Sequence, residues 1–264
     1  MSNPYDATST PSSNDERPIK MQYWRSYSYV FERKDWMANL LLCSVCFLIP
    51  VIGPLILMGY QFKVIEDLHK HPGQKMPKFD FSQFSELLSR GIYPFVVSLI
   101  LQLVLTPLCL ILWFLPMLFA GMFENEAILI LGIFVSFILI LVASVLGGMI
   151  TGPFLLRAGL SQSFGETFNF GWILHFMRMV WIEEIVSTLF FMFSSMLLVM
   201  VGLLLCFVGV YPAAALCMLA HAQMTYQQYE IFLARGGEPI PLKSPPAAPV
   251  ATLDHETTAT DESK

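Results

Sequence analysis

The sequence predicts an all-α integral membrane protein, a polytopic bundle of transmembrane helices. Three stretches contain no charged residue, namely Gly91 to Phe123, Ala127 to Leu156 and Ile185 to Tyr229, with 33, 30 and 45 residues. About 20 apolar residues let a helix cross a bilayer, so each stretch is long enough for at least one crossing. The composition agrees, because only 13% of residues are charged, against about 25% in soluble domains.

The positions of the basic residues predict the orientation in the membrane. All fifteen Lys and Arg lie outside the three charge-free stretches, and the connection from Met122 to Glu126 contains none. Cytoplasmic loops are enriched in Lys and Arg. We therefore expect a multi-pass protein of the cytoplasmic (plasma) membrane, with both termini in the cytoplasm and Glu124 outside. The net charge of -5 gives no indication of a nucleic-acid partner.

Polar segments flank the helical membrane domain, which we expect over residues 21–235. Residues 1–20 are rich in Ser, Asn, Pro and Asp, and residues 236–264 contain five prolines before an acidic end. Such compositions bury too little apolar surface to fold alone. Both segments are expected to be disordered, one as an N-terminal arm and the other as a Pro-rich acidic tail.

The first helices are expected to begin at the membrane interface. Residues 22–36 contain six aromatic side chains interleaved with three basic ones, a pattern typical of an amphipathic segment at headgroup depth. The uncharged run that follows, residues 36–59, is interrupted by Pro50, Gly53 and Pro54. A straight crossing would place basic residues on the outer side, so we expect a bent or re-entrant hairpin packed against the bundle.

The next two apolar runs predict one helical hairpin. The first contains three prolines and is expected to cross as a kinked helix, and the second returns after the Met122–Glu126 turn. On the returning helix, Ser144, Gly148 and Gly152 are spaced by four residues. A stripe of small residues of this kind lets another helix approach closely.

The last part of the chain predicts an interfacial segment followed by two more helices. Residues 164–184 combine six aromatic side chains with four charged ones, which is typical of the headgroup region. The run from Ile185 to Ala220 is too long for one crossing and is broken at Gly209 and Pro212. Two short helices that meet near Tyr211 are expected.

An internal echo is consistent with a duplicated unit. Gly-Pro followed by three apolar residues occurs twice, and each copy precedes an aromatic pair around a small polar residue, then a long apolar helix; the pairs are Phe79-Asp80-Phe81 and Phe168-Asn169-Phe170. Repeats with broken helices at matching positions are found in transporters. The expected helix-break motif consists of Pro50, Gly53, Pro54, Gly152 and Pro153.

Residues that could carry chemistry are few. No catalytic triad, nucleotide-binding loop or metal-ligand cluster is present, so we expect no enzyme activity and no cofactor. The polar candidates within the apolar runs are Asn39, Gln102 and His221, and no acidic or basic residue accompanies them. Ion-coupled carriers usually keep an ionisable group in the membrane. Convergence of the three polar residues on one water-filled cavity would favour transport.

A basic loop is the main candidate for binding lipid. Each basic side chain near a membrane surface contributes about 1 kcal/mol of attraction to anionic lipid. The alternative is that these charges only set the topology. The expected headgroup contacts are Lys63, Lys70, Lys75, Lys78 and Arg90.

Several motifs resemble a known family. They are Tyr27-x-Tyr29-x-Phe31 with Asp35-Trp36, residues 48–54, Gly59-Tyr60, Phe79-Asp80-Phe81 and Arg90-Gly91. Together they are similar to an uncharacterised family of bacterial and archaeal polytopic membrane proteins, known only as a domain of unknown function, over roughly residues 23–229. The Pro and Gly breaks and the Tyr226-x-x-Tyr229 ending are distantly similar to the membrane domains of some glycerophosphodiester phosphodiesterases. That similarity implies a lipid setting and brings no catalytic residues.

These observations lead to two functional hypotheses. The first is a non-enzymatic scaffold or accessory subunit that contacts lipid headgroups or a membrane partner. The alternative is a transporter or lipid-handling protein in which the Gly-Pro breaks open a polar path. The expected partners are membrane lipids and either another membrane protein or a second copy of the chain.

Overall fold

The computed structural model describes residues 20–123, 125–205 and 207–243, which form eight α-helices, one 3-10 turn (Phe81–Gln83) and no strand. The predicted all-α class is confirmed. Three helical segments are long and apolar enough to cross a membrane: Phe81–Gly121, Glu126–Ser161 and Phe170–Leu204. In their most apolar windows only 6%, 17% and 11% of residues are buried within the protein. Such extensive apolar exposure on helices of this length is expected of a membrane protein.

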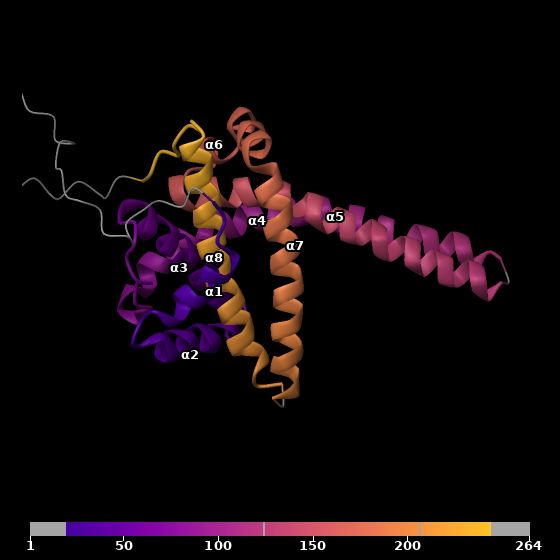
Figure 1. Cartoon of the computed structure of the whole chain (residues 1–264), viewed down its shortest axis with the longest axis horizontal. Helices are drawn as coiled ribbons and strands as arrows, with labels where there is room; N and C mark the ends of the chain where they lie inside the picture. Colours follow the sequence, from indigo (N-terminus) through magenta and orange to yellow (C-terminus); the bar gives the residue numbers. More distant parts are fainter. Residues whose placement is uncertain (1–19, 124, 206, 244–264) are drawn as a thin grey trace, which may run out of the picture.

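Two long hairpins leave a common core in different directions (Figure 1). The first consists of α4 (Phe84–Gly121) and α5 (Glu126–Ser161), as predicted. Three prolines lie inside α4 without ending it. Asn125 caps α5 by accepting a hydrogen bond from the backbone N–H of Ala127 at 2.9 Å, which satisfies one of the free N–H groups at the start of the helix.

The second hairpin has its break at the predicted Gly209, but its helices are longer than predicted. It consists of α7 (Phe170–Leu204) and α8 (Val210–Ala234), and neither is a short helix. Pro212 does not break the chain, because it lies in the first turn of α8, where a missing N–H costs nothing. The chain reverses direction between α7 and α8, where Gly202 lies against the backbone of Gly209. A Cβ on Gly202 would lie only 2.7 Å from the carbonyl oxygen of Gly209, so this approach requires glycine.

The predicted hairpin near the start of the chain is present. Helices α2 (Trp36–Phe47) and α3 (Ile52–Lys70) are joined by a turn that contains Pro50, and α2 packs against α8. The carbonyl of Cys46 accepts a hydrogen bond from the backbone N–H of Ile49 at 3.1 Å, so it is not left unpaired by the proline. A Cβ on Gly53 would lie 1.8 Å from that same carbonyl oxygen, which explains the glycine in the Gly-Pro pair.

The two halves of the sequence echo are only partly equivalent. Gly152-Pro153 lies in the interior of α5, which continues to Ser161, whereas Gly53-Pro54 lies in the first turn of α3, directly after the break between α2 and α3. The small polar residues, by contrast, have the same local role. The Asp80 carboxylate accepts from the N–H of Ser82 at 2.9 Å, and the Asn169 side chain accepts from the N–H of Trp172 at 3.1 Å. An internal duplication therefore stays a prediction.

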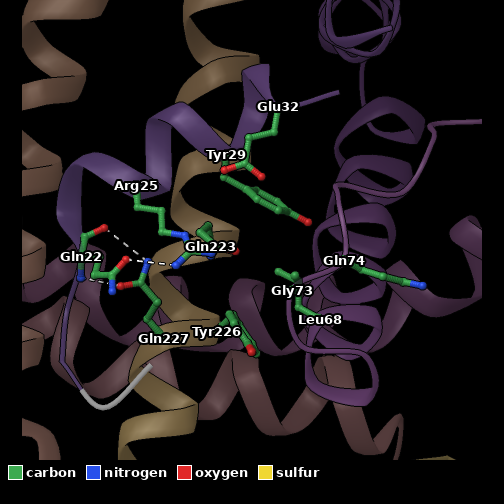
Figure 2. A pocket seen from close by; sticks show the side chains of 10 residues that line it. All are labelled: Gln22, Arg25, Tyr29, Glu32, Leu68, Gly73, Gln74, Gln223, Tyr226 and Gln227. Carbon is green, nitrogen blue, oxygen red and sulfur yellow. Dashed lines mark hydrogen bonds between the residues drawn. The ribbon is translucent and has the colours of Figure 1, made fainter. Parts of the chain in front are cut away.

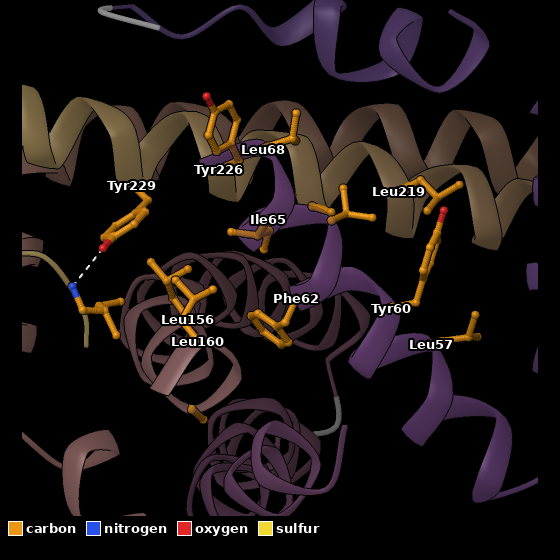
Figure 3. Close-up of a cluster of buried hydrophobic side chains, with 14 of the residues drawn as sticks. Leu57, Tyr60, Phe62, Ile65, Leu68, Leu156, Leu160, Leu219, Tyr226 and Tyr229 are labelled. Carbon is orange, nitrogen blue, oxygen red and sulfur yellow. Dashed lines mark hydrogen bonds between the residues drawn. The ribbon is translucent and has the colours of Figure 1, made fainter. Parts of the chain in front are cut away.

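The buried core, which we call the base, lies where the two hairpins meet. It contains side chains of α1 (Tyr23–Phe31), α3, the last turns of α5, the first turns of α7, and α8. Figure 3 shows side chains of α3 reaching between α5 and α8. The ring of Phe62 lies directly on Gly159, where a Cβ would be 2.1 Å from the ring carbon Cγ. Close helix approach at glycine thus fixes the packing of the base.

Part of the expected disordered tail packs against the base. Ile240 is 3% exposed, and its backbone N–H donates to the Tyr229 hydroxyl at 2.9 Å, a bond drawn in Figure 3. The indole N–H of Trp172 donates to the carbonyl of Glu238 at 2.7 Å. These contacts order the chain as far as Lys243, because an apolar anchor and backbone hydrogen bonds offset the entropy of the segment. Residues 1–19 and 244–264, including most of both predicted disordered ends, lie outside the described residues.

Candidate functional site

A polar cavity of about 190 Å³ lies between α5, α7 and α8, next to the base. We call it the α5–α7–α8 cavity. Its apolar walls include Leu155, Phe191 and Met224. Its polar lining consists of one carboxylate, one imidazole, one amide and four hydroxyl side chains: Thr151, Glu184, Ser187, Thr188, His221, Thr225 and Gln228.

The carboxylate of the cavity belongs to one of two adjacent glutamates with opposite environments. Glu183 lies near the surface and forms an ion pair with Arg235, directly after the end of α8. Glu184 is 7% exposed and points toward α5 and the cavity. Its carboxylate has no hydrogen-bond donor and no cationic partner among the described residues. Burying a carboxylate without such partners is costly, so this group marks the cavity as a functional candidate.

Small residues of α5 make room for Glu184. A Cβ on Gly152 would lie 3.0 Å from Oε1 of Glu184, and a Cβ on Gly148 would lie 3.3 Å from Cγ2 of Thr188. The predicted small-residue stripe therefore faces α7 at these two glycines, while Ser144 is exposed. Of the predicted helix-break motif, Gly152 thus lines the cavity, and the adjacent Pro153 lies inside α5.

A hydrogen-bonded chain ties α8 to α7 at the level of the carboxylate. The amide Nε2 of Gln228 donates to Oγ of Ser187 at 2.5 Å, and Ser187 donates to the backbone carbonyl of Glu184 at 3.1 Å. On the exposed side, His221 is held by Gln61 of α3 at 2.9 Å from its Nδ1. The imidazole also lies 5.0 Å from the ring of Phe191, measured between centroids. Contacts with α3 and α7 therefore hold the polar side chains of α8 in place.

The three polar residues singled out in the sequence do not converge. His221 reaches the α5–α7–α8 cavity. Asn39 instead donates to the carbonyl of Pro77 at 3.2 Å and accepts from the N–H of Phe79 at 3.1 Å, so it fixes the loop after α3. Gln102 lies in an open depression on α4 among apolar side chains. By the test set out above, their dispersal counts against a transport path built from these three residues.

The basic loop is mostly engaged in ion pairs. Lys63 contacts Glu86 at 3.2 Å. Glu66 contacts both Lys70 and Arg90, and Arg90 is only 8% exposed between α3 and α4. Lys75 and Lys78 are exposed. Of the five predicted headgroup contacts, these two are therefore the ones that are exposed and have no ion pair with another described residue.

Charged groups around the base are paired with one another. His69 Nδ1 lies 2.5 Å from Oε1 of Glu230, and Arg157 pairs with Glu166 at 2.9 Å and covers the Trp172 ring at 4.9 Å. Burial raises the pKa of Asp67 near the end of α3, against the opposing effect of the neighbouring Lys63. Within the described residues no group of three or more His, Cys, Asp or Glu side chains has the arrangement of a metal site.

A second cavity lies between α1, the end of α3 and α8 (Figure 2). Its volume of about 30 Å³ corresponds to about one water molecule. The hydroxyl of Tyr29 and Oε1 of Gln223 are buried there without a hydrogen-bond partner in the described part of the chain. Burial raises the pKa of the Tyr29 hydroxyl, which keeps it a hydrogen-bond donor. The space suits an ordered water and is too small for an organic ligand.

The comparisons with known proteins identify a family and no activity. A family model described as "Protein of unknown function (DUF4013)" matches residues 42–208, more than half of the chain. The predicted resemblance to a family of unknown function is thereby confirmed. Neither the curated proteins nor the solved structures gave a significant match. The distant similarity to glycerophosphodiester phosphodiesterase membrane domains therefore stays a prediction.

Proposed function

Because the chain belongs to the DUF4013 family, whose function is unknown, we propose a function from the geometry: the protein binds a small polar ligand or lipid headgroup in the α5–α7–α8 cavity. It would then act as a transporter or a lipid-handling protein, without enzyme activity. The observation that carries this proposal is the buried carboxylate of Glu184, which faces the cavity without a partner among the described residues. Binding sites in helical bundles are built this way, from convergent polar side chains.

The depth of the cavity supports this proposal. From Glu184 to Leu204, at the end of α7, is a helical distance of about 30 Å at about 1.5 Å per residue. This equals the thickness of a bilayer hydrocarbon core. Glu184 thus lies at the edge of the apolar region on the side of the base. A ligand could reach the cavity from the headgroup layer without crossing the hydrocarbon.

A scaffold or accessory subunit is the second candidate. The α4–α5 hairpin supports it, because Leu103 and Leu118 are 77% and 68% exposed and their apolar surroundings leave a long surface for contacts. Lipid covers such a surface equally well. A membrane protein partner or a second copy of the chain would use this hairpin rather than the cavity.

Native mass spectrometry of the full-length protein, released gently from its own membrane, tests the two candidates. We expect a retained lipid or small molecule in the wild type, loss of that mass in Glu184→Gln, and retention in Glu183→Gln. The adjacent substitution is a matched control, since it removes the same charge from a surface ion pair worth about 0.2–1 kcal/mol. A retained protein subunit that survives Glu184→Gln would favour the scaffold instead.

We also propose the plasma membrane as the location, with both termini in the cytoplasm. Glu124 lies outside the described residues, so we use Met122, which is 79% exposed at the end of the first hairpin. In a background without reactive native cysteines, Met122→Cys is expected to react with a membrane-impermeant maleimide added outside. A cysteine at Lys75, in the exposed loop after α3, should react only after the membrane is opened. The reverse labelling pattern would contradict this topology.

A further inference from the structure

The ligand of the α5–α7–α8 cavity has a definite chemistry. Building on the proposed function, we infer that this ligand carries a positively charged ammonium group, either as a soluble amine or as the headgroup of an aminophospholipid. The inference comes from three properties of the lining: its charge, the direction of its hydrogen bonds, and its size.

The acidic group of the lining has no cationic partner among the described residues. Among the described residues, Glu184 is the one acidic residue of the lining, and no Lys or Arg lines the cavity. Arg235 is engaged by the neighbouring Glu183. A buried carboxylate must be neutralised by a proton, a cation or a hydrogen-bonded partner. The cavity therefore offers a cationic ligand an ion-pairing partner, and offers none to an anionic group such as phosphate.

Three of the four hydroxyl groups of the lining offer acceptors rather than donors. Thr151 donates to the carbonyl of Gly147 at 2.9 Å, and Thr225 donates to the carbonyl of His221 at 2.9 Å. Ser187 donates to the carbonyl of Glu184, as described above. A hydroxyl has a single proton to donate, so these three present lone pairs to the cavity. An ammonium group, with up to three N–H donors and no acceptor, complements such a lining.

The size of the cavity favours an organic cation over a metal ion. A volume of about 190 Å³ equals about six water molecules at about 30 Å³ each. Calcium takes six to eight oxygen ligands at about 2.3–2.6 Å, several of them usually carboxylates, and magnesium demands near-ideal octahedral geometry at about 2.0–2.1 Å. One carboxylate in a cavity of this size does not meet that requirement, whereas an ammonium with a short carbon chain fits beside the apolar side chains of Leu155, Phe191 and Met224.

The test measures the thermal unfolding of the full-length protein in detergent with ethanolamine hydrochloride as the probe. Sodium chloride at equal ionic strength and ethylene glycol, which replaces the ammonium by a hydroxyl, are the controls. Ethanolamine should raise the Tm with concentration, and the two controls should not, because ligand that binds only the folded state stabilises it. Glu184→Gln should need at least ten times more ethanolamine for the same shift, while Glu183→Gln behaves as the wild type.

The source of the ammonium group is decided in lipid nanodiscs. If the lipid supplies it, phosphatidylethanolamine should raise the Tm of the wild type relative to phosphatidylglycerol, and this difference should vanish in Glu184→Gln, whether or not free ethanolamine acts. If Glu184→Gln does not fold, the wild-type series of charged and neutral probes still decides.

Equal responses to ethanolamine and ethylene glycol, together with no difference between the two lipids, would overturn the ammonium inference. A response to ethanolamine that Glu184→Gln leaves unchanged would overturn it as well. The proposed function has a separate outcome. If native mass spectrometry finds a neutral or anionic ligand that depends on Glu184, only the ammonium inference fails; if it finds no such ligand, the proposed function fails too.

Discussion

Glu66→Met is expected to lower the free energy of unfolding by about 3–5 kcal/mol. Glu66 and Arg90 are both 8% exposed and form an ion pair between α3 and α4. Removing the carboxylate leaves the guanidinium buried without its partner, and an arginine cannot lose its proton to escape that cost. Chemical denaturation of the purified protein in a mild detergent measures the difference.

The partner substitution should have a smaller effect. In Arg90→Met, Glu66 keeps its contact with Lys70, which is 43% exposed and can follow the carboxylate. The double variant Glu66→Met/Arg90→Met should recover most of the stability, because well-packed apolar residues often replace a buried ion pair without loss. Glu86→Gln is the surface control, with an expected cost below about 1 kcal/mol. Equal losses in Glu66→Met and Glu86→Gln would contradict this account.

The sequence predicted the helices better than it predicted what they bury. A helix that crosses a bilayer needs about 20 apolar residues without charge, so the positions of the charge-free stretches were enough to locate the helices of the α4–α5 hairpin. In the α7–α8 hairpin the predicted break at Gly209 is correct, whereas the predicted break at Pro212 and the short helices are wrong. Whether a proline ends a helix depends on its position in the first turn, which hydropathy does not reveal.

The candidate site was missed for a related reason. The sequence places Glu183 and Glu184 together in an interfacial segment, whereas in the structure Glu183 faces Arg235 and Glu184 faces α5. The kink at Val180, where φ is -122° and ψ is 19°, precedes the two glutamates and changes the direction of the helix. A signal was nevertheless present. Gly148 and Gly152 of α5 are four residues apart, as are Glu184 and Thr188 of α7. Residues at this spacing lie on one face of a helix, so each pair presents one face to the other helix.

The second prediction with a large expected effect concerns Gly59 and Gly91, two glycines of the sequence motifs. Gly91→Ala is expected to cost more than about 3 kcal/mol, beyond the usual range for an overpacked site. A Cβ on Gly91 would lie 1.8 Å from the carbonyl oxygen of Leu55, and a Cβ on Gly59 would lie 1.9 Å from that of Leu87. These obstacles are backbone atoms, so no rotation of a side chain relieves them, and α3 must separate from α4.

The matched control is another helical glycine in an apolar helix. Gly147 of α5 has its nearest neighbour, Cδ1 of Leu105, 3.8 Å from the Cβ position, which is an ordinary contact distance. Gly147→Ala should be neutral or stabilising by up to about 1 kcal/mol, because alanine has the higher helix propensity. Thermal unfolding of the two variants in the same detergent compares them directly. If both variants melt like the wild type, α3 and α4 are not held backbone to backbone, and the buried Glu66–Arg90 pair that depends on this approach would lose its structural basis.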